Sequence, residues 1–230
     1  ANAVNQMAEG LEERESLKGA LVHYVRSQAA DSKVSGASNE ETTPTERRVT
    51  ALVAELFGFS QLSSQLGSER VFALLNEYFS TMIDVILRHG VSLEKSNDES
   101  VIAIFGAQNV DPHQERHAIE ASLAMQGALE QLIDAWKIQT NLPVFLEIGI
   151  HTGTARVQHT GLQDQLDFES VHEVVAVAGD IAKVGRQHEN RLTVSDTTAE
   201  NLHHTFPLDS VDDDSLNFAI FSVSMPKVRV

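Results

Sequence analysis

A cluster of charged side chains in the stretch LEKSNDESVIAIFGA, residues 93–107, is the first candidate for chemistry in this chain. Glu94, Lys95, Asp98 and Glu99 lie within six residues, at the polar tip of a pattern that predicts strand, turn and strand. Hard cations prefer carboxylate oxygens, so this tip could hold a metal ion. Acidic residues at hairpin tips are more often simply solvated, and the residues alone favour that interpretation.

The composition narrows the partners and the compartment of the chain. It has 230 residues, no cysteine and a formal net charge of -16. Such an acidic protein repels phosphate backbones, so we expect no nucleic-acid partner. The lack of cysteine excludes disulfides and thiol chemistry and fits a reducing compartment. No apolar run has the length of a membrane span, so we expect this fragment to be soluble; its opening without an initiator Met indicates a piece of a longer protein.

Two segments without globular character precede the expected domain. Residues 1–30 carry apolar side chains at helical spacing among many charges, which predicts a helix and favours a coiled-coil seam. Residues 31–46 are polar and contain Gly, Pro, Ser and Thr, which is typical of a linker. We therefore place one folded domain over 47–224 and a short tail over 225–230.

Strand-like and helix-like patterns alternate over the domain and predict an α+β fold. Apolar residues recur with a 3.6-residue period over 69–89 and 113–138, which predicts two amphipathic helices. The order β-α-β-β-α-β indicates a ferredoxin-like sandwich, with helices on one face and an antiparallel sheet on the other. Strands are expected at 49–59, in both arms of 93–107, at 143–153, at VHEVVAVAG (171–179), at 191–195 and at 215–225, with a short helix over 179–187.

Several of these segments, in order and spacing, resemble the catalytic domain of class III nucleotide cyclases. VAELFGFS is similar to the first strand of that family, F-A-D-I-x-G-F-T, and EKSNDESVIAIFG is similar to its hairpin, D-K-x-x-G-D-x-x-M-A-x-F-G. IGIHTG matches a later strand, and the resemblance covers about residues 47–200. AVNQMAEGLEERESLK resembles the last helix of HAMP signalling modules, which link membrane receptors to such domains.

The resemblance implies a metal site at which two substitutions have occurred. Class III cyclases join the 3′-hydroxyl of ATP or GTP to the α-phosphate, and two Asp residues hold Mg²⁺ or Mn²⁺ ions for that reaction. These Asp positions fall on Glu55 and Glu99, and the Gly before the second falls on Asp98. Each glutamate moves its carboxylate by about 1 Å, against a tolerance of roughly 0.5 Å. We expect a vestigial cation site, or none.

The positions that read the purine and stabilise the transition state depart further from the family pattern. Lys95 matches the purine-reading Lys, but its partner position falls on Ala176, which cannot hydrogen-bond a base through its side chain. In the motif G-D-x-V-N-x-x-x-R, the Asn position falls on Lys183 and the Arg position on Gln187. Arg186 lies one residue early, which on a helix is a rotation of about 100°. We expect Lys183 and Arg186 to be solvated basic side chains, and ordinary ATP or GTP binding to be lost.

The leading hypothesis is a cyclase homology domain with little or no cyclase activity, in the cytoplasmic part of a HAMP-linked inner- or plasma-membrane receptor. It would act as a homodimeric signalling module. Family active sites form at the dimer interface, so a pair with an intact cyclase domain would restore only part of each site. One alternative is a divergent cyclase that uses Glu55 and Glu99 on a larger cation such as Mn²⁺, with Arg186 or Lys183 on the phosphates. Another is a non-catalytic dimer module that senses a nucleotide or a cation.

Overall fold

The structure of the chain is a computed structural model that describes residues 45–63, 66–89, 91–93, 100–107, 110–136, 143–160, 163–166, 168–188 and 191–224. The helix expected over 1–30, most of the linker and the tail over 225–230 lie outside these ranges. The first strand begins at Thr45, two residues before the expected start of the domain.

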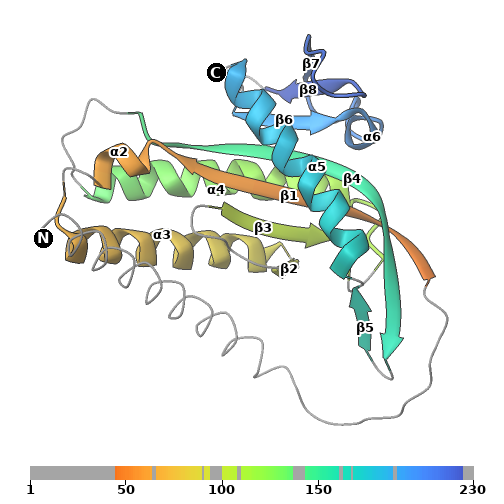
Figure 1. Cartoon of the computed structure of the whole chain (residues 1–230), viewed down its shortest axis with the longest axis horizontal. Helices are drawn as coiled ribbons and strands as arrows, with labels where there is room; N and C mark the ends of the chain where they lie inside the picture. Colours follow the sequence, from red (N-terminus) through yellow and green to blue (C-terminus); the bar gives the residue numbers. More distant parts are fainter. Residues whose placement is uncertain are drawn as a thin grey trace, which may run out of the picture. The chain divides into compact units, whose positions relative to one another are not determined.

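The described strands form one mixed sheet with the pair β1 and β4 in its middle (Figure 1). Strand β1 pairs antiparallel with β3 on one side and with β4 on the other, while β4 pairs parallel with β6. The order is β2-β3-β1-β4-β6-β8-β7, and β5 pairs with β4. The order 2-3-1-4 of the first four strands confirms the expected ferredoxin-like α+β core. The strands are β1 (Thr45–Phe57), β2 (Ser92–Leu93), β3 (Ser100–Phe105), β4 (Phe145–Thr160), β5 (Gln163–Leu166), β6 (Leu192–Ser195), β7 (Leu208–Val211) and β8 (Ile220–Val223).

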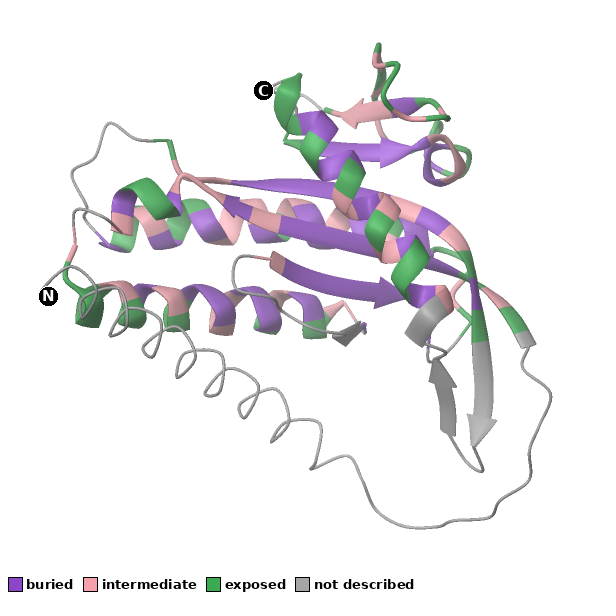
Figure 2. Cartoon of the chain, viewed as in Figure 1, coloured by how far each residue is buried: buried purple, intermediate pink, exposed green. Residues whose placement is uncertain are grey.

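The two amphipathic helices expected from the sequence are confirmed; the first contacts β2 and β3, and the second contacts β1, β3 and β4. They are α3 (Ser68–Arg88) and α4 (Gln114–Trp136), and the short α2 (Phe59–Ser63) follows β1. Helix α3 buries Leu74, Tyr78 and Met82, which recur at the helical spacing read from the sequence. The indole of Trp136 donates a hydrogen bond of 2.8 Å to Glu77 and joins the two helices. Buried residues run along β1, β3 and β4 (Figure 2).

Helix α5 (Phe168–Gln187) shows that two expectations from the sequence are wrong: the strand over residues 171–179, and the placing of all helices on one face of the sheet. The strand expected over VHEVVAVAG and the short helix after it are one continuous helix, whose buried residues Val171, Val174, Ala178 and Ile181 follow a helical spacing. The first three pack against the β1 residues at odd positions, whereas α3 and α4 take the other face. Helices therefore cover both faces of the sheet. The run of β-branched residues resembled a buried strand because a helix packed closely on a sheet is also rich in apolar residues.

A glycine on β4 allows α5 to approach the sheet closely. A Cβ atom at Gly149 would lie 2.0 Å from the carbonyl oxygen of Ala178 and 2.5 Å from the backbone nitrogen of Ala182. Both atoms belong to the backbone of α5, so no side-chain rotation could relieve the clash. The helix can cross β4 at this distance only where the strand has no side chain.

A buried chain of hydroxyl groups joins the central sheet to β6 and to α6 (Asp196–Ala199). Thr50 bonds Thr152 at 2.9 Å, Thr152 bonds Thr198 at 3.0 Å, and Thr198 bonds Ser195 at 3.0 Å. The chain ends where Ser195 bonds the imidazole of His151 at 2.9 Å. Since each buried hydroxyl has a partner, this chain stabilises the junction without an unpaired polar group. The strands expected at 191–195 and 215–225 appear here as β6 and as the shorter β8.

We expect Gly149→Ala to lower the free energy of unfolding by about 1–3 kcal/mol, because α5 must move away from β4 to admit the methyl group. Chemical denaturation of the purified chain measures this change. Gly127→Ala is the matched control, since nothing lies within 4 Å of a Cβ at that position in α4. This control should be stabilised by about 0.5–1 kcal/mol. Equal effects of the two substitutions would contradict the close crossing.

Candidate functional site

The structure divides the residues singled out from the sequence into three groups. Those at the hairpin tip lie outside the described residues: Lys95, Asp98 and Glu99. Glu55 lies near the end of β1. The remaining residues are on α5: Ala176, Lys183, Arg186 and Gln187. The structure brings two members of the second and third groups, Glu55 and Arg186, into direct contact.

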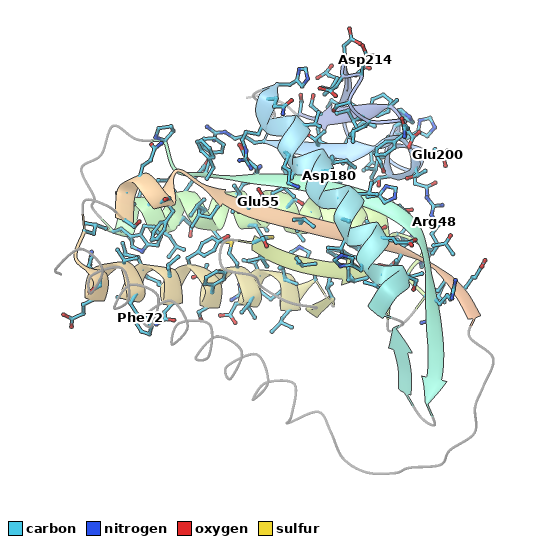
Figure 3. All side chains as sticks on the ribbon, in the orientation of Figure 1. Arg48, Glu55, Phe72, Asp180, Glu200 and Asp214 are labelled. Carbon is cyan, nitrogen blue, oxygen red and sulfur yellow. The ribbon has the colours of Figure 1, made fainter. Side chains whose placement is uncertain are left out.

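Arg186 binds Glu55 of the same chain. Its Nη2 atom donates a hydrogen bond of 2.7 Å to Oε2 of Glu55. Strand β1 places Glu55 at an odd position, on the face that α5 covers, and Figure 3 shows Glu55 beside the place where α5 crosses the sheet. The expectation that Arg186 is a solvated side chain is therefore wrong. The helical rotation that separates it from the family's Arg position directs its guanidinium onto β1 of its own subunit.

Glu147 completes this contact and was missed in the sequence analysis. It lies on β4 directly opposite Glu55, and its Oε2 accepts a hydrogen bond from Nε of Arg186. Only 1% of Glu147 is exposed, and its Oε1 atom has no hydrogen-bond partner in the part of the chain that the structure describes. The signal in the sequence was one acidic residue inside the otherwise apolar run FLEIGI. A charge in a strand buried on both faces requires a partner.

Two aromatic side chains from the sheet lie next to the three charged groups. The guanidinium carbon of Arg186 lies 5.4 Å from the centre of the Phe57 ring, and that ring packs on Phe145 with a centroid distance of 4.9 Å. Burial raises the pKa of Glu147 above its ordinary value, the nearby Arg186 opposes this shift, and the charge of Glu55 adds to it. The guanidinium of Arg186 thus favours the charged form of Glu147.

The other positions on α5 are exposed and separate from this contact. Lys183 donates a hydrogen bond of 2.9 Å to Asp180, one turn before it on the same helix. The side chains of Lys183 and Asp180 are 61% and 57% exposed, so Lys183 is the solvated residue that we expected. Ala176 and Gln187 are exposed as well. The described part of α5 therefore presents one long cation to the sheet, which is Arg186.

As arranged, these residues suit a guanidinium better than a metal ion. Oε2 of Glu55 and Oε2 of Glu147 both accept hydrogen bonds from Arg186, so a metal ion would have to displace it. Over the described ranges, no group of three or more His, Cys, Asp or Glu side chains is placed to hold a metal ion.

Comparison with known proteins finds a family model that matches most of the chain. The sequence model of the family described as "Adenylate and Guanylate cyclase catalytic domain" matches residues 41–218. Adenylate cyclase 1 of Rhizobium meliloti is 29% identical over 150 residues, which are 65% of this chain and 22% of that protein. The chain therefore spans about a fifth of the length of that relative.

Solved structures show the same fold. The adenylyl cyclase CyaB of P. aeruginosa superposes with a TM-score of 0.65 at 18% identity, over 82% of this chain and 100% of that one. A structure titled as the non-canonical dimeric guanylyl cyclase domain of the RhoGC fusion protein from Blastocladiella emersonii has a TM-score of 0.59 at 17% identity, over 80% and 99% of the two chains. At these identities the likeness concerns the fold.

We expect Arg186 and Glu147 to be strongly coupled. A double-mutant cycle of Arg186→Ala and Glu147→Ala, followed by chemical denaturation, should give a coupling energy of about 1–3 kcal/mol. Loss of Arg186 alone should be the more destabilising single change, because it leaves a buried carboxylate unpaired. Lys183 and Asp180 are the matched control on the same helix, and their exposed pair should give less than about 0.5 kcal/mol. A coupling no larger than that of the control would show that Arg186 does not stabilise Glu147.

Proposed function

The chain belongs to the adenylate and guanylate cyclase catalytic domain family, and from this premise we propose that it is a catalytically silent, or nearly silent, member that acts as a signalling module. The observation that supports this most directly is the contact between Arg186 and Glu55. The resemblance to the family assigns Glu55 to a metal position. Here the positive charge at that carboxylate comes from an arginine of the same chain.

The cost of freeing Glu55 supports the proposal. A metal ion at Glu55 must compete with Arg186, and moving Arg186 away leaves Glu147 buried without its cation. An uncompensated buried carboxylate is costly, so the competing equilibrium favours the arginine. Mg²⁺ or Mn²⁺, when bound in members of this family, activates the 3′-hydroxyl and holds the phosphates. In this chain Arg186 binds the carboxylate of Glu55, so that carboxylate is not free to bind such an ion.

Substrate recognition is weakened at the positions on α5 as well. Ala176 is exposed and has no side-chain donor or acceptor for a purine. Lys183, at the position of the family's ribose-orienting Asn, is paired with Asp180. Gln187, at the position of the family's phosphate-binding Arg, has no charge. These substitutions support the loss of ordinary ATP or GTP binding together with the loss of the metal site.

The signalling role of the domain is part of the same proposal. The HAMP-like segment at the start of the chain supports a place in the cytoplasmic part of a membrane receptor, where a paired helix would pass a signal to a homodimer. None of the helices in the described ranges combines the length and apolar character that a membrane-spanning helix requires. A fungal protein of the same fold is titled a non-canonical dimeric guanylyl cyclase domain, which supports pairing through this scaffold. Pairing with an intact cyclase domain is the other arrangement that the scaffold permits.

Product detection by mass spectrometry tests the proposed loss of activity. The purified chain is incubated at high concentration with ATP or GTP and with Mg²⁺ or Mn²⁺, and the reaction is searched for cyclic AMP and cyclic GMP. We expect no product above that of a reaction without protein, while cyclic nucleotide added to a parallel sample shows that the product survives and is detected. Turnover that disappears in Glu55→Ala would overturn the proposal, since the glutamate would then serve as a metal ligand.

A further inference from the structure

We propose that the guanidinium of Arg186 is a built-in cation that bridges Glu55 and Glu147 in place of a divalent metal ion, so that folding of this domain does not depend on metal. This inference rests on the proposed function and deepens it, because it identifies what occupies the former metal position. Glu147, which the sequence analysis did not single out, is the second carboxylate of this bridge.

The two carboxylates need a shared cation because of where the sheet places them. Glu55 on β1 and Glu147 on β4 are direct partners in the antiparallel register. Directly opposite residues have Cβ atoms about 4.5–5.5 Å apart, and like charges at such positions destabilise a sheet. Burial of Glu147 strengthens the repulsion, because less water screens it. A cation between the two acids attracts both carboxylates and so offsets much of this repulsion.

Arginine can supply that cation better than the other basic residues. Its planar guanidinium presents five donors in a fixed fork, which allows one group to bind two carboxylates at once. In this chain Nη2 of Arg186 binds Glu55 and Nε binds Glu147. The face of Phe57 lies against the guanidinium and favours it further. Arg186 is 38% exposed, so water still reaches part of the charge that it carries into the site.

The packing of α5 places Arg186 at the two acids. The backbone of Ala182 approaches the backbone of β4 at Gly149. Arg186 lies four residues beyond Ala182, about 6 Å along the helix. Glu147 lies two residues before Gly149 on the same face of the strand, about 7 Å away. Figure 1 shows α5 crossing β4 obliquely, with its C-terminal end toward the end of the sheet where β4 begins. Both displacements lead from the crossing toward that end, where Arg186 binds Glu147.

Removal of the guanidinium should convert the bridge into a metal site. Two adjacent carboxylates provide oxygen ligands of the kind that Mn²⁺ accepts, and water can complete the coordination. In the native chain Arg186 already binds both carboxylates, so a metal ion would have to displace it. Mn²⁺ should therefore leave the thermal stability of the domain unchanged while Arg186 is present, and should raise it once the charge of Arg186 is removed.

The test compares thermal unfolding of the native chain and of Arg186→Met, with and without MnCl2 and without nucleotide. Methionine keeps an apolar side chain next to Phe57 and removes the charge. We expect Tm of the native chain to be unchanged by Mn²⁺, and Tm of Arg186→Met to rise by about 3–5 °C at about 10 mM Mn²⁺. The double variant with Arg186→Met and Glu147→Gln should lose this rise, because one of the two carboxylates is gone.

Lys183→Met is the matched control for charge. It removes one positive charge from the same helix, at an exposed pair with Asp180, and leaves the bridge intact. We expect its Tm to be as insensitive to Mn²⁺ as that of the native chain, so a response confined to Arg186→Met reports the bridge and not the high net negative charge. Failure of Arg186→Met to fold alone, with refolding in Mn²⁺, would also support the inference.

Three results would overturn the inference. The first is a rise in Tm of the native chain with Mn²⁺ that Glu55→Gln abolishes. The second is a rise in Tm of Arg186→Met that is no larger than that of Lys183→Met. The third is failure of Arg186→Met to fold with or without Mn²⁺. The proposed function is judged separately by the product assay. A native chain that binds Mn²⁺ at Glu55 and forms no cyclic nucleotide would contradict the built-in cation alone, whereas cyclic nucleotide formation that requires Glu55 would contradict the silent role.

Discussion

The buried carboxylate of Glu147 is the constraint on which the arrangement of this site depends. A charge in a strand that is covered on both faces must have a cation within hydrogen-bonding distance. Helix α5 supplies that cation through Arg186, and it can do so because Gly149 admits the helix to the surface of β4. The same guanidinium also pairs with Glu55, so one cation serves both neighbouring acids.

The same contact separates the scaffold from the chemistry of its family. The sheet order and the helices on both faces superpose on solved cyclase domains, so the packing of the core is retained. The polar positions have new partners within the subunit, since Arg186 binds Glu55 and Lys183 binds Asp180. The resemblance to the family implies that its phosphate-binding Arg, whose position falls on Gln187 here, acts across a dimer interface. Arg186 binds Glu55 of its own subunit and so cannot also bind groups of a second subunit. This contact is the physical basis of the silent role that we propose.

The C-terminal part of the domain shows how polar groups can hold elements together without charge. The hydroxyl chain from Thr50 through Thr152 and Thr198 to Ser195 is buried and paired at each step. Burial lowers the pKa of His151, at the end of this chain, below its ordinary value, which favours the neutral imidazole where it meets Ser195. This junction contrasts with the Arg186 bridge, where a full charge is buried and a full charge must compensate it.

Much of the fold was determined by the sequence alone, because its signals are local. The 3.6-residue period of α3 and α4, the apolar run of β1 and the family motifs were sufficient to predict the α+β core, and they place Glu55 on β1. The sequence predicts a strand over residues 171–179, the first part of α5, because valines suit both structures, and only the packing surface that the folded sheet provides decides between them. The bridge was likewise beyond the sequence. Glu55, Glu147 and Arg186 are far apart along the chain, and their contact depends on the register of β1 and β4 and on the close crossing at Gly149. Register and crossing arise from packing among distant segments, so tertiary structure alone decided which cation the acids would share.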